Sequence, residues 1–279
     1  MFVIRRAARA GVLLLSGCLL VGSVMSTSLA SEGGGRGGGS AKLAPGPILV
    51  SLGDSYSSGV GTGIYLLRSA ECHRSPVAYP YLLAGEHAWT LRFKACAGAT
   101  TSAVQNRQLD VLSRRTDVVT VGVGGNDAGF TGVLVECAKP SWMADCAHAV
   151  AQARDRIRTV LPHRLNQLYS SITSAARRAK VIVVGYPRLF NGEDCNAGTF
   201  FSPQEEGWLN DEADLLDSTL ARRAAAHGLV FADPRHLFED HAVCDRIEWV
   251  NGLSAPVEES YHPNRLGQEA LVKLLDRLL

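Results

Sequence analysis

Residues 47–59 read Pro-Ile-Leu-Val-Ser-Leu-Gly-Asp-Ser-Tyr-Ser-Ser-Gly. The first six form a short aliphatic run bounded by turn residues, which predicts a buried strand. Small and polar residues follow at once, so Ser55 is expected at the carboxyl end of that strand, where open α/β sheets bind ligands. A helix beginning near Tyr56 would leave backbone N–H groups free to bind an oxyanion. Asp-Ser is also an ordinary helix N-cap, so this stretch alone does not establish a reactive serine.

Further segments with the composition of buried strands alternate with segments of helical pattern. This alternation predicts an α/β fold with a mainly parallel sheet that helices cover on both faces. Strands are predicted at 117–123, 181–187 and 229–232. A further short strand is predicted to begin at Phe93 and to turn through small residues up to Thr101. The predicted helices are 79–86, 104–112, 147–178 with a break near Pro162, 203–227 and 266–279.

Composition limits the classes of function. The chain has 279 residues, of which 46% are apolar, enough for one sizeable domain. All three charges in the first 30 residues are arginines, which leaves 25 basic against 27 acidic residues. This balance argues against nucleic-acid binding. The glycines of 59–63 do not have the spacing of a dinucleotide site, and the chain lacks the Gly-x-Ser-x-Gly motif of α/β-hydrolases.

The N-terminus has the pattern of an export signal. Three arginines within residues 5–9 precede a mostly apolar run over 11–25, and Ser28-Leu29-Ala30 offers small residues for cleavage. We therefore predict a signal peptide at 1–30, a glycine-rich linker at 31–42 and a catalytic domain at 43–279.

Two other interpretations of the N-terminus stay open. Leu15-Ser16-Gly17-Cys18 resembles a bacterial lipobox, which would leave the protein anchored through an acylated Cys18. The apolar run continues past this cysteine, which favours cleavage after Ala30 instead. An uncleaved membrane anchor is disfavoured because the run is short for a spanning helix.

The cysteines support export. Six follow the predicted signal, and an even number in an exported protein suggests three disulfides. Fifteen pairings are possible. The simplest is sequential: Cys72–Cys96, Cys137–Cys146 and Cys195–Cys244. A zinc site using Cys137, Cys146 and His148 is the competing interpretation, which the absence of any Cys-x-x-Cys pair disfavours.

Three turn segments supply the groups that acyl transfer by a serine requires: residues 53–55, 124–127 and 260–264. Ser55 is the candidate nucleophile and His262 the candidate base. The Asn126 amide and the backbone N–H groups of Ser55 and Gly98 are the candidate oxyanion donors. Neither a metal nor an organic cofactor is needed for this chemistry.

These segments resemble the four sequence blocks of the SGNH, or GDSL, hydrolases, in the same order. Gly53-Asp54-Ser55 matches the first block, the Gly98 loop the second, Gly124-Gly125-Asn126-Asp127 the third, and His262-Pro263-Asn264 the last. The spacing and the six cysteines look most like secreted lipases and esterases of actinomycetes. The resemblance implies a flavodoxin-like three-layer α/β/α sandwich around about five mainly parallel strands.

One position departs from the family pattern. The family's usual acid is an aspartate three residues before the histidine, and here that residue is Glu259. Glu259 is one candidate to orient His262. A backbone carbonyl just upstream, such as that of Ser260, is the other, because some similar actinomycete members dispense with the acid.

The function that these observations predict is a secreted lipase or esterase acting on a small-molecule or lipid ester. The alternatives are a phospholipase A, a thioesterase, a carbohydrate deacetylase, or a non-catalytic module that binds cell-wall glycan or lipid. A degenerate module would be expected to lose Ser55, Asn126 or His262, and all three are present. We also expect a monomer that makes transient contact with lipid surfaces.

Overall fold

The computed structural model describes residues 46–279, and the predicted signal peptide (1–30) and linker (31–42) lie outside this part. The first element of regular structure begins at Ile48. Of the helices in residues 46–279, none is both long enough and apolar enough to cross a lipid bilayer.

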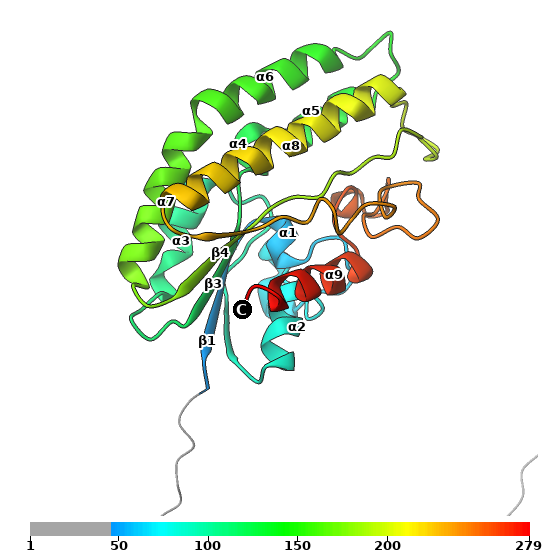
Figure 1. Cartoon of the computed structure of the whole chain (residues 1–279). Coiled ribbons are helices and arrows are strands. Elements are labelled where there is room, and N and C mark those ends of the chain that lie inside the picture. The colour runs from blue at the N-terminus through cyan, green and yellow to red at the C-terminus, as the bar shows by residue number, and fades with distance from the viewer. Residues whose placement is uncertain (1–45) are drawn as a thin grey trace, which may run out of the picture. The chain divides into compact units, whose positions relative to one another are not determined.

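A parallel sheet of five strands forms the centre of the domain (Figure 1). The strands are β1 (Ile48–Gly53), β2 (Thr90–Phe93), β3 (Val118–Gly122), β4 (Lys180–Val184) and β5 (Val230–Ala232). Their spatial order is β2-β1-β3-β4-β5, and every neighbouring pair is parallel. This is the order of flavodoxin-like folds, whose ligands bind where the strand order reverses, beyond β1 and β3. The predicted fold class is confirmed.

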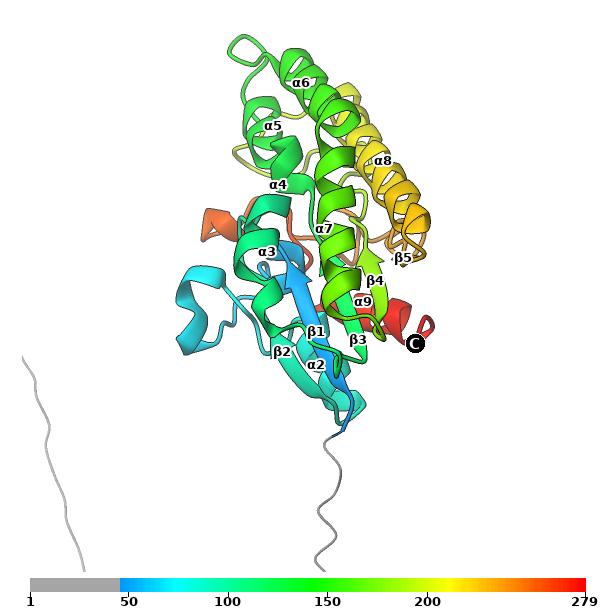
Figure 2. The same ribbon diagram turned by 90° about the vertical axis from the view of Figure 1, so that its left-hand side faces the viewer.

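Helices cover both faces of the sheet (Figures 1 and 2). They are α2 (Tyr79–Glu86) and α9 (Arg265–Asp276) on one face, and α3 (Thr101–Arg107) and α7 (Leu161–Ala175) on the other. Successive side chains of a strand point to opposite faces, so Leu49 packs in the first apolar core and Val50 in the second. Burial on both faces explains why β1 and β3 are almost continuously apolar.

Helix α8 (Pro203–Ala226) lies beside α7 and covers β4 and β5 on the same face. Helices α1 (Ser55–Ser58) and α4 (Gly125–Ala128) follow the carboxyl ends of β1 and β3, and α5 (Phe130–Cys137) and α6 (Cys146–Thr159) come after them. Short 3₁₀ turns lie at Leu67–Cys72, Leu109–Val111 and Val257–Glu259. Helix α6 packs against both α5 and α8. Ser202 and Glu205 form a capping box that fixes the start of α8.

Two predicted helices have different limits in the structure. The segment 147–178 forms two helices, because Pro162 in the first turn of α7 has no N–H to continue the hydrogen-bond ladder of α6. The helix predicted from 104 begins at Thr101, where the side chain of Thr100 accepts a hydrogen bond from the N–H of Ala103.

The strand predicted from Phe93 instead ends at that residue. The N–H groups of Lys94 and Ala95 both donate to the carbonyl of Ser51, at 2.9 and 3.1 Å, so the regular ladder with β1 stops. The chain then enters a turn after Cys96, which carries Gly98 in the left-handed region with φ of 73°.

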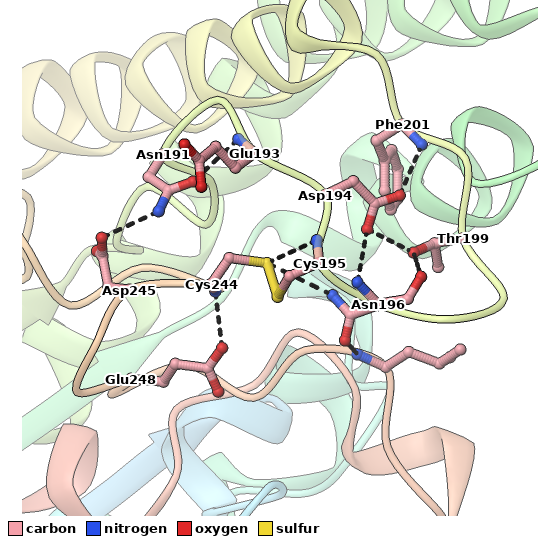
Figure 3. Close-up of a disulfide and its surroundings, with 11 residues drawn as sticks. Asn191, Glu193, Asp194, Cys195, Asn196, Thr199, Phe201, Cys244, Asp245 and Glu248 are labelled. Carbon is pink, nitrogen blue, oxygen red and sulfur yellow. Dashed lines mark hydrogen bonds between the residues drawn. A yellow bond between two sulfur atoms is a disulfide. The ribbon is translucent and has the colours of Figure 1, made fainter.

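All three predicted disulfides are present, and the pairing is sequential: Cys72–Cys96, Cys137–Cys146 and Cys195–Cys244. The sulfurs of Cys137 and Cys146 therefore bond to each other, where the alternative interpretation had them hold zinc. Figure 3 shows how Cys195–Cys244 joins the segment after β4 to the segment after β5. The carboxylate of Glu248 accepts a hydrogen bond from the N–H of Cys244 at 2.7 Å and supports this junction.

Candidate active site

Ser55 begins α1, two residues after β1 ends at Gly53. Gly53 has φ of 134°, and a β-carbon there would lie 2.3 Å from the carbonyl oxygen of Gly122, so only glycine fits. The buried side chain of Gln108 accepts from the N–H of Gly53 at 2.8 Å and donates to its carbonyl at 2.9 Å. Gln108 therefore fixes both the N–H and the carbonyl of Gly53, two residues before Ser55.

Asp54 holds the turn and faces away from the serine hydroxyl. One carboxylate oxygen caps α1 by accepting from the N–H of Tyr56 at 3.1 Å, and the other accepts from the Tyr186 hydroxyl at 2.5 Å. Burial raises the pKa of Asp54 to about 7, and these two hydrogen bonds oppose the shift. The pKa of Tyr186 is raised by burial and by the neighbouring carboxylate. Asp54 is thus a positioning group for the nucleophile.

His262 lies directly against Ser55. Its Nε2 is 2.8 Å from the Ser55 Oγ, and its Nδ1 is 2.8 Å from the backbone carbonyl of Ser260. A carbonyl oxygen only accepts, so Nδ1 carries the proton and Nε2 presents its lone pair to the serine. Burial lowers the pKa of His262 to about 4, and the hydrogen bond to Ser260 opposes this shift. The imidazole is consequently neutral at pH 7 and able to accept a proton.

The segment around His262 is held by Asn251 in the loop before it and by the distant Gly61. Asn251 donates its N–H to the His262 carbonyl at 3.0 Å and accepts from the N–H of Tyr261 at 2.9 Å. Its side-chain amide donates to the carbonyl of Gly61 at 2.8 Å. A β-carbon on Gly61 would lie 2.9 Å from the Cβ of His262. Tyr261 has φ of 58°, a strained value that these contacts maintain.

Glu259 does not contact the imidazole. Its Oε1 accepts from the Tyr65 hydroxyl at 2.7 Å, and that hydroxyl accepts from the N–H of Gly61 at 3.2 Å. Of the two candidates left open by the sequence, the structure brings the Ser260 carbonyl, and not the Glu259 carboxylate, to His262.

Asn126 lies on α4, which directly follows β3. Its Nδ2 donates one hydrogen bond to the carbonyl of Ala99 at 3.1 Å, which leaves the second hydrogen for a ligand. Gly98 is adjacent to this carbonyl but is exposed and does not line the cavity that contains Ser55 and Asn126. Within residues 46–279, the backbone N–H groups of Ser55 and Gly98 have no acceptor in the protein.

Ser55, Asn126 and His262 line a cavity of about 560 Å³. The rest of its wall is largely apolar, and α5, the segment before α8 and the loop before α9 supply it. The apolar lining includes Phe130, Leu134, Leu189, Phe200, Leu216, Leu253 and Val257. A long apolar group could occupy this cavity with its polar end at Ser55.

Several residues of the site escaped the sequence analysis. Tyr186 follows the end of β4, so the rule that sites form at the carboxyl ends of parallel strands could have identified it. Gln108 and Asn251 have no local signal, because each acts through contacts with a residue more than fifty positions away. Tyr65 likewise has no local signal, because its hydroxyl joins the site through Glu259, which is 194 positions away.

Comparisons with known proteins agree with this geometry. The model of the GDSL-like lipase/acylhydrolase family matches residues 51–270. A protein named lipase from Streptomyces rimosus is 42% identical over 221 residues, which cover 78% of this chain and 81% of that protein.

Two solved structures have the same fold at substantial identity. The crystal structure of an extracellular lipase from Streptomyces rimosus has a TM-score of 0.79 and 39% identity, over 84% of this chain and all of that one (100%). That of phospholipase A1 from Streptomyces albidoflavus NA297 has a TM-score of 0.79 and 38% identity, over 83% of this chain and 99% of that one. The predicted family is therefore confirmed: the chain belongs to the GDSL-like lipase/acylhydrolases and is a carboxylic ester hydrolase.

Proposed function

We propose that this protein is an exported lipase or esterase that cleaves lipid acyl esters through a covalent intermediate on Ser55. The observation that carries the proposal is the 2.8 Å contact between the Ser55 Oγ and Nε2 of the neutral His262 imidazole, in the wall of a largely apolar cavity. A nucleophile paired with an oriented base is the arrangement that acyl transfer requires.

In the first step, the Ser55 Oγ bonds to the ester carbonyl carbon while its proton passes to His262 Nε2. The carbonyl oxygen becomes an oxyanion, which accepts hydrogen bonds from the Asn126 amide and the Ser55 N–H, the two candidate donors whose residues line the cavity. The tetrahedral intermediate then expels the alcohol, which takes the proton from Nε2 and leaves the acyl group on Ser55.

In the second step, water gives a proton to His262 Nε2 and attacks the acyl-serine. Collapse releases the carboxylic acid and returns the proton to the Ser55 Oγ. Throughout, the Ser260 carbonyl accepts from Nδ1–H and stabilises the transient imidazolium, the role that a carboxylate has in a Ser-His-Asp triad. We assign Glu259 no proton-transfer role, because its carboxylate accepts a hydrogen bond from the Tyr65 hydroxyl and none from His262.

The apolar wall supports acyl chains as the group bound beside Ser55, and it disfavours the carbohydrate deacetylase alternative. Phospholipids are the second substrate class, because a phospholipase A1 is 38% identical over 83% of this chain. A non-catalytic module is disfavoured, since the nucleophile, base and oxyanion donor lie on one cavity.

Export is supported by the signal-like N-terminus, by three disulfides and by the extracellular lipase of Streptomyces rimosus. We propose cleavage after Ala30 and a monomeric product. Intact mass of the protein recovered from a bacterial host distinguishes this from a lipoprotein, whose mature chain would begin at an acylated Cys18.

The test is hydrolysis of chromogenic acyl esters from short to long, by the protein and by Ser55→Ala. We expect turnover in the parent that Ser55→Ala abolishes, and an optimum chain length that separates lipase from esterase. Asn126→Ala should lower kcat about 10²–10³-fold, the usual effect of removing one oxyanion donor. Equal activity in Ser55→Ala would overturn the nucleophile assignment.

A further inference from the structure

We propose that the mouth of the cavity is surrounded by a docking face that binds the surface of aggregated, electrically neutral lipid. The docking face consists of Val135, Trp142, Met143, Phe200, Leu253 and Val257. The proposal rests on the proposed function, because it identifies where an enzyme acting on lipid esters would meet its insoluble substrate.

The members of the docking face are unusually exposed for large apolar side chains. Trp142 is 81% exposed, Met143 64%, Val257 63%, Val135 61% and Phe200 54%. Soluble proteins rarely leave several such side chains together in water, and clusters of them mark binding surfaces. Four of the six also line the cavity, so the exposed apolar surface continues inward to Ser55.

The docking face is made continuous by contacts between three segments: the loop 138–145 after α5, the segment 196–200 before α8 and the loop around Leu253 before α9. The N–H of Phe200 donates to the carbonyl of Ala138, at the end of α5, at 3.1 Å. The Leu253 side chain lies 3.2 Å from the position of a β-carbon on Gly198, and the Leu253 N–H donates to the Asn196 side chain at 3.0 Å. Figure 1 shows the three segments on the same side of the domain.

The loop that carries Trp142 and Met143 is held in place at its base. The Cys137–Cys146 disulfide closes this loop, and the N–H of Met143 donates to the carbonyl of Pro140 at 2.8 Å. Pro140 lines the cavity. Trp142 is therefore fixed beside the mouth with its indole in solvent, where its apolar ring and polar N–H suit the interface between lipid and water.

The charge of the surrounding sequence indicates which lipid surface would fit. Residues 140–144, 196–204 and 249–257 contain no Asp, Glu, Lys or Arg. Two charged residues also line the cavity: Lys139, which is paired with Glu136, and the exposed Glu258, whose negative charge disfavours an anionic surface. Binding to anionic membranes depends on clusters of basic residues near the surface, and these three segments have none. A neutral or zwitterionic surface is the partner that matches.

Vesicle flotation with phosphatidylcholine tests the proposal. Ser55→Ala provides an inactive background, so that the vesicles stay intact while binding is measured. In that background we compare Trp142→Ser/Met143→Ser with Tyr81→Ser. Neither Trp142 nor Met143 lines the cavity, and Tyr81 is a 44% exposed aromatic on α2, outside the docking face.

We expect the Ser55→Ala protein to bind vesicles. The double variant should bind at least about tenfold more weakly, because burying even one large apolar side chain in lipid strengthens binding about tenfold or more. Tyr81→Ser should bind like its parent. In the active protein, the double substitution should lower turnover of emulsified long-chain ester by a similar factor and leave turnover of a dissolved short-chain ester unchanged.

Two results would overturn the docking face. One is vesicle binding that is absent in the parent or unaffected by the double substitution. The other is a dimer in sedimentation analysis that the double substitution dissociates, since the face would then bind a second copy of the chain. Failure of the proposed function is separate: it would appear as no hydrolysis of the dissolved ester by the unsubstituted protein.

Discussion

Ser55 and His262 face each other across 2.8 Å, but the chain positions them in different ways. Ser55 stands where a buried strand turns into a helix, and regular secondary structure determines its place. His262 lies in a segment whose backbone is irregular apart from the turn at Val257–Glu259, and contacts from Asn251 and Gly61 hold it. The nucleophile therefore lies at the junction of two regular elements and the base in an irregular segment, so substitutions should affect the two sides differently.

The largest effect is expected from His262→Ala. Without the base, the Ser55 hydroxyl keeps its proton, and kcat should fall about 10⁴-fold or more. The thermal transition should change little by comparison, because the neighbouring backbone pairs of Asn251 remain. Steady-state kinetics on a dissolved ester, with a melting curve of each protein, check both statements. A kcat within about tenfold of the parent would remove His262 from the mechanism.

Gly61→Ala should disturb the base while leaving the nucleophile in place. The new β-carbon would lie 2.9 Å from both the Cβ of His262 and the carbonyl oxygen of Pro263, and φ of 97° disfavours any side chain. Since a displacement of about 1 Å can cost about 10²-fold, we expect kcat to fall about tenfold to a hundredfold.

Gly85→Ala is the matched control for that substitution. Gly85 lies within α2, and a β-carbon there has nothing within 4 Å. Its kinetics should equal those of the parent, and its stability should rise slightly because alanine favours the helix. Kinetics of Gly61→Ala equal to those of the parent would show that the loop accommodates the β-carbon without moving His262. The proposed difference between the Ser55 and His262 regions would then be wrong.

Glu259→Gln separates the two candidates for the partner of His262. Because the Ser260 carbonyl occupies Nδ1, we expect less than a tenfold loss of kcat. Tyr65→Phe removes the other end of the same hydrogen bond and should give a similar small loss, and the double variant should be little worse than either single one. A loss of about 10⁴-fold in Glu259→Gln alone would make Glu259 a triad acid.

The smallest effect concerns pH. Burial disfavours the imidazolium and lowers the pKa of His262 to about 4, so the neutral base persists as the pH falls below 6.5 and is lost only as it approaches about 4. We expect His262 to add no acid limb to kcat/KM for a dissolved, uncharged ester between pH 8 and 6, whereas Asp54, whose pKa burial raises to about 7, titrates within that range. An acid limb centred near 6.5 that persists in Asp54→Asn would indicate that His262 is solvated in the working enzyme.

The same contrast explains how far the sequence alone could lead. The parallel sheet was predictable because buried strands in such sheets are continuous apolar runs, and Gly53-Asp54-Ser55 follows the strand directly. The candidate residues Ser55, Asn126 and His262 came from short motifs. The choice between Glu259 and Ser260 was not predictable, because it depends on where Tyr65 lies.

Backbone geometry accounts for the other differences. The end of β2 at Phe93 depends on two N–H groups sharing the Ser51 carbonyl, which no residue pattern indicates. Gln108 and Tyr186 hold the nucleophile from elements that pack beside it only in the folded chain. Tyr261 adopts φ of 58° without being a glycine, so its turn had no sequence signal.

Each disulfide lies at the root of one segment bordering the active site. Cys72–Cys96 precedes the Gly98 turn, Cys137–Cys146 closes the Trp142 loop, and Cys195–Cys244 anchors the segment that carries Phe200. The strands of the sheet are joined by hydrogen bonds and side-chain packing. Cys137–Cys146 encloses only the Trp142 loop, whereas each of the other two pairs encloses a helix and a strand of the sheet. The Trp142 loop is therefore the segment that can be exchanged between related enzymes as one cross-linked unit, provided that both of its cysteines are kept. Substrate preference can then diverge while the scaffold that presents Ser55 stays the same.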